Sequence, residues 1–354
     1  MRRSARLLVI GAAMLMLTLT AWARPAPAAT RVVGPGNSIQ AAVDAAQPGD
    51  TIVVVGLHHE NVAITKDGIT LRGLGAVLEP ATTPTENACF DPSEPEDVNG
   101  ICVLGDVNFD TGEVIREVRD VTVSGFTIRG FSDSGITAFG AHGATFMANV
   151  ADDNDEYGIT AFVSTGTRML FNRVSGSHEA GLYIGDSPNA TVTVVGNESF
   201  DNLFGILIRN SEHGTVVGNN VHDNCLGIPF FADIPGPAGL FNLVANHISD
   251  NTKACPASED APFPVSGVGV ALLGATGVTV AGNIITGNVP SAESDLSGGV
   301  VVTTGLGGTP PTNNHVHGNR IVHNQPDLFW DGSGTGNAFQ GNRCQTSSPP
   351  GLCR

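Results

Sequence analysis

The chain has 354 residues, of which 41% are hydrophobic and 14% charged, enough to fill the core of one large domain or two ordinary ones. Its 17 basic and 34 acidic residues give a net charge of -17, which disfavours nucleic acids and anionic membranes as partners. After the N-terminus no apolar run reaches the roughly 18 residues of a membrane span, which excludes a polytopic membrane protein.

Residues 1–29 are typical of a secretory signal peptide. Arginines precede an apolar run from Leu7 to Trp22, and the small-residue pattern Ala26-Pro27-Ala28 follows it. The run has about 16 residues where a membrane span needs roughly 20, so we expect cleavage near Ala28 or Ala29 rather than an uncleaved anchor. Cleavage would leave a charge of about -21, because the leader holds four arginines and no acid. We therefore expect a secreted protein, extracellular or in the cell envelope, without membrane contact after cleavage.

Residues 38–46 predict a short helix. Ser38 is a typical N-cap residue, and the apolar side chains of Ile39, Val43 and Ala46 fall on one helical face. Such a face would close the open end of a core. The apolar segment 52–54 then predicts the first strand.

A glycine followed by an alternating apolar segment recurs along the chain, at steps of 23, 23, 24 and 22 residues. The repeated glycines are Gly135, Gly158, Gly181, Gly205 and Gly227. Period-two alternation predicts short strands, and stacking such units in register predicts a parallel β-solenoid. The aliphatic residues expected to form a column in its core are Ile136, Ile159, Leu182, Ile206 and Ile228.

Asparagine marks the same period. It occupies one position of eight units: Asn149, Asn172, Asn197, Asn219, Asn246, Asn283, Asn319 and Asn342. In six of these units a second asparagine follows five residues later: Asn154, Asn202, Asn224, Asn251, Asn288 and Asn324. A side-chain amide both donates and accepts, so aligned asparagines can hydrogen-bond from one rung to the next at the turns.

The pattern Gly-Asn followed by Asn and Gly-Ile resembles the right-handed parallel β-helix repeats of the pectin-lyase-like superfamily, including NosD-like maturation factors of nitrous-oxide reductase. The resemblance implies an all-β right-handed parallel β-helix over residues 30–347 with a short N-terminal capping helix, and a tail at 348–354. The superfamily includes lyases, hydrolases, esterases, epimerases and non-catalytic proteins. No catalytic motif of its enzymes matches this sequence, so the resemblance assigns no catalytic residue.

Loop insertions interrupt the repeats near residues 81–118, 232–264 and 289–312. Insertions in solenoids often carry binding function. The alternative is that these insertions are merely tolerated and have no function. A copper role of the maturation-factor type needs Met, Cys or His ligands, and outside the leader methionine occurs only as Met147 and Met169.

The six cysteines predict disulfides, because the chain is expected to be exported. Nearest neighbours in sequence would each close a loop, pairing Cys89 with Cys102, Cys225 with Cys255, and Cys344 with Cys353. A zinc site is the alternative, but the sequence has no CxxC or paired-histidine spacing.

Aspartates recur four residues after the first asparagine. Asp201, Asp223 and Asp250 would lie on consecutive rungs, roughly 5 Å apart, where repulsion favours proton uptake or a bound cation such as Ca²⁺. His222 lies beside Asp223, and His178 occupies a rung without the aspartate. The alternative is a turn of solvated carboxylates.

Alternation also predicts outward-facing residues on the strand after each glycine. They include Phe139, Phe162, Tyr183, Arg209 and Phe231. Exposed rings in a row suit the apolar faces of sugars, and an arginine suits a uronate carboxylate. The alternative is that a neighbouring loop covers these side chains as a satellite core.

Two functions are compatible with these features. The first is binding or processing of an extracellular, acidic polysaccharide, by a lyase or related enzyme in which a cation neutralises the uronate and His178, His222 or Arg209 is the base. The second is a non-catalytic solenoid for surface or protein interaction. The sequence does not predict an oligomeric state.

Overall fold

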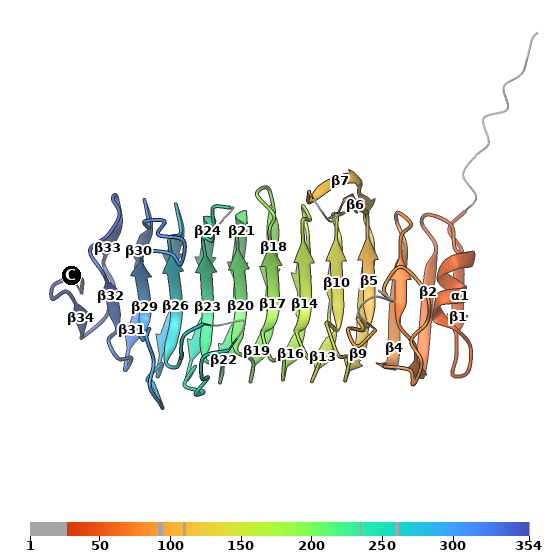
Figure 1. Ribbon diagram of the computed structural model, residues 1–354, viewed down its shortest axis with the longest axis horizontal. Coiled ribbons are helices and arrows are strands. Elements are labelled where there is room, and N and C mark those ends of the chain that lie inside the picture. Colours follow the sequence, from red (N-terminus) through yellow and green to blue (C-terminus); the bar gives the residue numbers. More distant parts are fainter. Residues whose placement is uncertain (1–26, 91–94, 109–110, 234–235, 259–261, 354) are drawn as a thin grey trace, which may run out of the picture.

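The computed structural model describes residues 27–90, 95–108, 111–233, 236–258 and 262–353. Residues 1–26 of the predicted signal peptide lie outside this part. The described chain winds into a right-handed parallel β-helix, with its one short helix at the N-terminal end and the C-terminus at the other (Figure 1). No helix in the described ranges is long and apolar enough to span a membrane.

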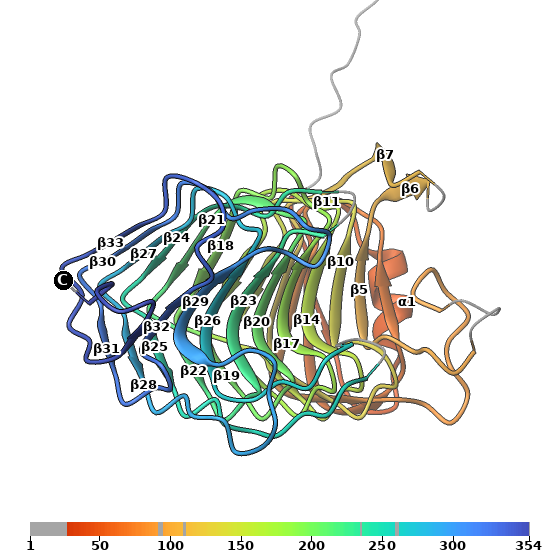
Figure 2. The ribbon, with the colours of Figure 1, turned by 60° about the vertical axis from the view of Figure 1, so that its left-hand side comes forward.

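One face of the solenoid is an 11-stranded parallel sheet. Its strands are β3 (Val62–Ile64), β5 (Ile101–Leu104), β10 (Ile136–Phe139), β14 (Tyr157–Phe162), β17 (Ala180–Gly185), β20 (Phe204–Arg209), β23 (Leu226–Phe231), β26 (Val268–Leu273), β29 (Gly298–Thr303), β32 (Leu328–Trp330) and β34 (Ser347–Ser348). Figure 2, turned toward the solenoid axis, shows these strands stacked one behind another.

The remaining faces form a 19-stranded sheet that bends around the core. Its strands are β1 (Thr30–Val33), β2 (Thr51–His59), β4 (Thr70–Glu79), β9 (Thr122–Arg129), β12 (Thr145–Met147), β13 (Val150–Asp152), β15 (Arg168–Leu170), β16 (Arg173–Ser175), β18 (Val192–Val195), β19 (Glu198–Phe200), β21 (Glu212–Val217), β22 (Asn220–His222), β24 (Gly239–Val244), β25 (His247–Ser249), β27 (Thr279–Ala281), β28 (Ile284–Thr286), β30 (His315–His317), β31 (Arg320–Val322) and β33 (Ala338–Gln340). The long strand β9 pairs with both β12 and β13, so each later rung breaks one strand into two at a bend.

The predicted aliphatic column forms the core. Ile136, Ile159, Leu182 and Ile206 stack in register on successive strands, and each is fully buried, as is Ile228. The repeated glycines follow from this stacking. A Cβ on Gly135 or Gly158 would lie 2.7 or 2.6 Å from the carbonyl oxygen of the equivalent glycine one rung away, so neighbouring backbones approach too closely for a side chain.

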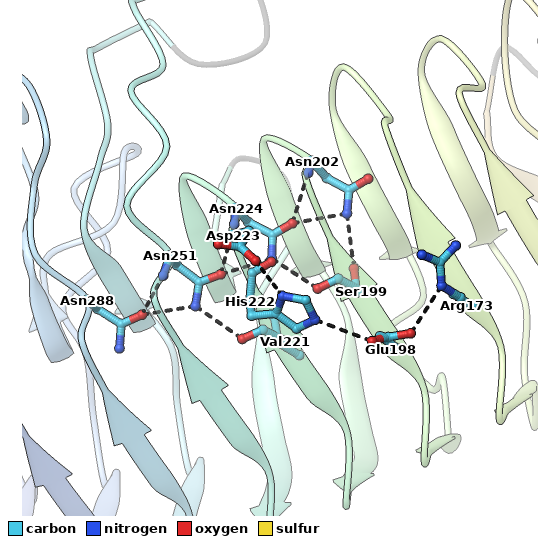
Figure 3. A network of polar contacts seen from close by, with 10 residues as sticks. All are labelled: Arg173, Glu198, Ser199, Asn202, Val221, His222, Asp223, Asn224, Asn251 and Asn288. Atoms are coloured by element: carbon cyan, nitrogen blue, oxygen red, sulfur yellow. Dashed lines mark hydrogen bonds and ion pairs between the residues drawn. The ribbon is translucent and has the colours of Figure 1, made fainter.

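Both asparagine series form the predicted ladders. The side chains are buried, and the first ladder lies at the bend of the 19-stranded sheet. The backbone N–H and Nδ2 of Asn172 both donate to Oδ1 of Asn197, at 2.8 and 3.0 Å, while Nδ2 also donates to the Phe146 carbonyl at 3.0 Å. Figure 3 shows part of the second ladder, in which Asn224 bonds to Asn251 in the same way. Each amide thus satisfies backbone groups where the strands turn.

The N-terminal end is closed by α1 (Ile39–Ala45), as predicted. Ser38 caps it by accepting a hydrogen bond from the Ala41 N–H at 3.1 Å, and Ile39 and Val43 are buried against the core. A feature that the sequence did not reveal is Glu60, whose carboxylate accepts from the Ile39 N–H at 2.7 Å. A carboxylate at a helix N-terminus is favourable because it meets unpaired N–H groups.

The three cysteine pairs are those predicted: Cys89–Cys102, Cys225–Cys255 and Cys344–Cys353. Each predicted insertion range contains strands of the solenoid, so the inserted loops are shorter than those ranges. Range 81–118 includes β5, the hairpin of β6 (Asp106–Asn108) and β7 (Glu113–Arg116), and β8 (Val118–Arg119), which pairs with β11 (Ala141–His142). Ranges 232–264 and 289–312 include β24, β25 and β29. The predicted tail begins inside β34 and is attached through Cys353.

Candidate functional site

Two neighbouring cavities lie on the outer face of the 11-stranded sheet, with volumes of about 370 and 430 Å³. The polar lining of the first comes from Glu156, Glu179, Arg209 and Asp233. The polar lining of the second comes from Asp97, Asn99, Asp133, Ser134, Thr137 and Glu156. Because they share Glu156 and follow the strands from β5 to β23, we treat them as one groove. Five strand intervals of about 4.8 Å give it a length of about 24 Å.

A cluster of aromatic rings lies beneath the two cavities, and only some of its rings line them. Tyr157 and Tyr183 stack with ring centroids 4.8 Å apart, and Phe162 meets both rings edge to face. Phe162 and Phe139 are half-buried and line the second cavity. Rings of this kind can contact the apolar face of a sugar.

The prediction of an exposed aromatic row is wrong for Tyr183 and Phe231, which are 1% and 6% exposed. They belong to a satellite core with Leu207 and Val265, and Phe263 packs on it from the segment that follows Cys255. Covering large apolar side chains in this way avoids an exposed hydrophobic patch. Phe231 still borders the first cavity. The ring of Tyr183 does not, but its hydroxyl forms a hydrogen bond with a residue that does.

That hydroxyl bonds to Arg209, the predicted binding arginine. Nε of Arg209 also donates to Oδ2 of Asp233 at 2.7 Å. Partial burial acts to lower the pKa of Arg209, but the hydrogen bonds with Asp233 and Tyr183 outweigh it and raise the pKa. The raised pKa favours the protonated guanidinium, which disfavours the predicted role of Arg209 as a base. The guanidinium is a fixed cation at the first cavity.

Glu156 and Glu179 occupy the same position on adjacent rungs, since the Glu179 N–H donates to the Glu156 carbonyl at 3.1 Å. Burial raises the pKa of Tyr157, and the neighbouring charges of Glu179 and Glu156 raise it further. The phenol therefore stays protonated and donates to Glu179. The first cavity thus combines three carboxylates, a protonated phenol and a guanidinium.

The second cavity is lined by carboxylates without a basic side chain among its described residues. Oδ2 of Asp133 accepts from Asn99 at 2.6 Å, and Oδ1 accepts from Ser134 at 2.8 Å. Desolvation and the charge of Asp133 raise the pKa of Asp97.

The predicted histidines do not join this site. His178 is 82% exposed in a turn, where it pairs with Asp155. His222 lies on β22 of the other sheet, where Nδ1 bonds to Oδ2 of Asp223 at 2.7 Å and Nε2 lies 3.4 Å from Glu198 (Figure 3). Neither imidazole lines the groove, so the structure does not bring His178, His222 and Arg209 together as one catalytic set.

The repeated aspartates have a backbone explanation. Asp201, Asp223 and Asp250 have φ of 58, 55 and 53°, and other rungs place Gly176 and Gly287 at this position with φ of 73 and 74°. Both aspartate and glycine adopt this left-handed conformation more readily than most residues do, which explains why they alternate at this position. Among the residues that the structure describes, no three acidic, histidine or cysteine side chains gather to hold a metal ion. The three aspartates are thus not assembled as the predicted metal site, although calcium dependence itself stays a prediction.

Sequence reasoning missed Asp97, Asp133, Glu156, Glu179 and Asp233. A signal for three of them was present, because Asp133, Glu156 and Glu179 each stand two residues before a repeated glycine. Asp97 and Asp233 lie in insertions, outside any repeat.

A family model described as a right-handed beta helix region matches residues 98–234. Similar solved structures include the crystal structure of Dettilon tailspike protein (gp208), with 12% identity, 90% coverage of this chain, 68% of that chain and a TM-score of 0.58. A mutant of the periplasmic alginate epimerase AlgG has 14% identity, coverage of 84% and 69%, and a TM-score of 0.54. At such identity the likeness shows the fold alone. None of the curated proteins matches this chain in sequence.

Proposed function

We propose that this chain, a right-handed parallel β-helix protein of the pectin-lyase-like type, binds an extracellular polysaccharide along the groove of its 11-stranded sheet. The observation that carries the proposal is one elongated groove that combines half-buried rings with a fixed guanidinium and several carboxylates. Sugar sites need this combination of flat apolar contact and convergent polar groups.

Each part of the groove has a role in this proposal. Phe139 and Phe162 contact the C–H faces of sugar rings, and the carboxylates accept hydrogen bonds from sugar hydroxyls. Arg209 donates to sugar oxygens, and Asp233 holds its side chain in place. Because Asp233 and Tyr183 already orient the guanidinium, binding costs little side-chain entropy there.

Two solved structures of the same fold support the choice of ligand. One is a tailspike protein, and the other is an alginate epimerase, which by its name acts on a polysaccharide. The predicted signal peptide and the three disulfides favour an oxidising compartment, and we propose secretion on that basis.

Cleavage of the bound chain is a second candidate, favoured by the adjacent positions of Glu156 and Glu179. Glycoside hydrolysis uses two carboxyl groups, about 5–5.5 Å apart in retaining enzymes and roughly 6.5–9.5 Å apart in inverting ones. Loss of hydrolysis on Glu156→Gln or Glu179→Gln, with binding retained, would support this candidate. The lyase expected from the sequence is a competing outcome, recognised by unsaturated uronide products.

Calorimetric titration with hexasaccharides of neutral, acidic and amino sugars tests binding. We expect Phe162→Ala to weaken the tightest interaction at least tenfold. Phe171→Ala is a matched control, because Phe171 is 62% exposed at the bend between β15 and β16 and should leave affinity unchanged. Equal affinity in both variants, or no binding by any hexasaccharide, would contradict the proposal.

A further inference from the structure

The two ends of the groove differ in how far the sheet beneath them is covered. Strand register connects one outward-facing position from β5 to β26, in the order in which Figure 1 shows these strands along the solenoid. Toward the N-terminal end this position holds Leu104, Phe139 and Phe162, which are half-buried and line the second cavity. Toward the C-terminal end it holds Phe231 and Leu273, which are only 6% and 2% exposed. The outer face of the sheet is therefore accessible at one end and covered at the other.

Two inserted segments cover the sheet beyond β23. Ala271 on β26 and Val301 on β29 are fully buried in the satellite core. Phe263, from the segment before β26, and Leu296, from the segment before β29, pack on this core. The groove therefore does not extend over β26 and β29.

Hydrogen bonds hold these two segments together. The Asp295 N–H donates to the Pro264 carbonyl at 3.0 Å, and the Ser266 N–H donates to Oγ of Ser294 at 2.8 Å. The first segment is also attached to Cys225 through a disulfide. The cover over these strands is thus fixed by several interactions and is part of the fold.

Side chains from both edges of the sheet close the first cavity. Phe263 precedes β26 and Leu306 follows β29, and both line the cavity together with Arg209 of β20. No described residue of β26 or β29 itself lines either cavity. At the opposite end of the groove, Thr65, which follows β3, is exposed. The described part of the groove is therefore closed at its C-terminal end alone.

We propose that the groove binds the end of a polysaccharide chain, with the terminal sugar in the first cavity. The inference rests on the proposed function and specifies which part of the polymer is recognised. A chain that follows the half-buried rings ends against Phe263 and Leu306. An interior sugar would carry a further sugar into the space that these side chains fill, whereas a terminal sugar has only a hydroxyl there. Arg209 lines the same cavity and can donate a hydrogen bond to that hydroxyl.

The test counts binding sites per gram of polymer. Polygalacturonate, chitosan and pullulan represent acidic, amino-sugar and neutral polymers, and each would be prepared as two fractions that differ tenfold in mean chain length. Both fractions would be titrated with the protein by calorimetry. For the polymer that binds, we expect about tenfold more protein bound per gram of the shorter fraction, because that fraction has tenfold more chain ends. A site for chain interiors predicts equal binding per gram.

A pair of variants tests whether the closed end holds the terminal sugar. Leu306→Trp narrows the first cavity and should weaken binding of the shorter fraction at least tenfold. Leu74→Trp is the matched control, because Leu74 is equally exposed, at 51%, and lies on β4 of the other sheet. It should leave the affinity within twofold. Equal affinities of the two variants would overturn the inference.

The outcomes also separate this inference from the proposed function. Equal binding per gram of both fractions, lost on Phe162→Ala, would overturn the assignment to chain ends and keep the polysaccharide groove. Absence of binding of all three polymers by the folded protein, or binding that Phe162→Ala leaves unchanged, would overturn both.

Discussion

Two positions in the turns that lead from the 19-stranded sheet to the 11-stranded sheet carry repeated acidic residues, for different reasons. At the turns beside the 19-stranded sheet, Asp201, Asp223 and Asp250 repeat because the backbone there is left-handed. Closer to the 11-stranded sheet, in the bends just before its strands, Asp133, Glu156 and Glu179 repeat without left-handed backbone and line the groove. Position within the rung therefore distinguishes structural acids from candidate binding acids, whereas residue type does not.

The largest effect should come from the core that both sheets share. Ile206→Asp places an unpaired charge in the fully buried column, at a cost of several kcal/mol, on the order of the whole stability of a domain. We expect this variant to be unfolded by circular dichroism. Thr193→Asp, on the outer face of β18, is the control and should melt within a few degrees of the wild type. Cooperative melting of Ile206→Asp near the wild-type temperature would contradict the stacking described above.

Removing a disulfide should have the next largest effect. The loss of stability should increase with the length of the loop that the disulfide closes. Cys225–Cys255 closes a separation of 30 residues and Cys344–Cys353 one of 9, for which chain entropy gives about 3.6 and about 2.6 kcal/mol. Replacing each pair by alanines and measuring urea unfolding should give losses in that order. The first loss should also lower glycan affinity, because that disulfide holds the segment whose Phe263 lines the first cavity. Unchanged unfolding midpoints would refute this ranking.

Removing one asparagine of the ladder should cost about as much stability as removing one disulfide. Asn219→Ala removes an amide that accepts from Asn197 and donates to the Val194 carbonyl at 3.0 Å. It leaves buried groups unpaired at about 1–3 kcal/mol each, so we expect a loss of about 3 kcal/mol in urea unfolding. Asn220→Ala, next to it but only half-buried, should lose less than about 0.5 kcal/mol. Similar losses in the two variants would show that the ladder adds no special stability.

The smallest effects should come from the turn aspartates. Because Asp223 has a φ of 55°, Asp223→Asn should change stability by less than about 0.5 kcal/mol, and Asp223→Ala should lose about 1 kcal/mol or more. Thermal melts with calcium and with chelator test the cation hypothesis at the same time. The backbone explanation predicts the same calcium response in wild type and Asp223→Asn. A stabilisation by calcium that only the wild type shows would restore the metal site.

The solenoid could be predicted from the sequence because every rung has the same local requirements at the same positions. Glycine where backbones touch and asparagine where strands bend are needed in every rung, so their period is visible without a structure. The groove was harder to predict. Asp97 and Asp233 come from insertions, and the burial of Tyr183 depends on a segment near residue 263 that is distant in sequence. Such contacts follow from how loops pack, and no repeat encodes them.

Carboxylate footprinting tests most directly whether the outer face of the 11-stranded sheet is the glycan site. The protein would be labelled with a carbodiimide and an amine, with and without the hexasaccharide that binds most tightly, and each acid quantified by mass spectrometry. We predict that labelling of Asp133, Glu156 and Glu179 falls on binding, while that of Glu198 on β19 and of Asp223 in the turn after β22 is unchanged. Protection confined to Glu198 and Asp223, or unchanged labelling of the groove under saturating ligand, would contradict the account.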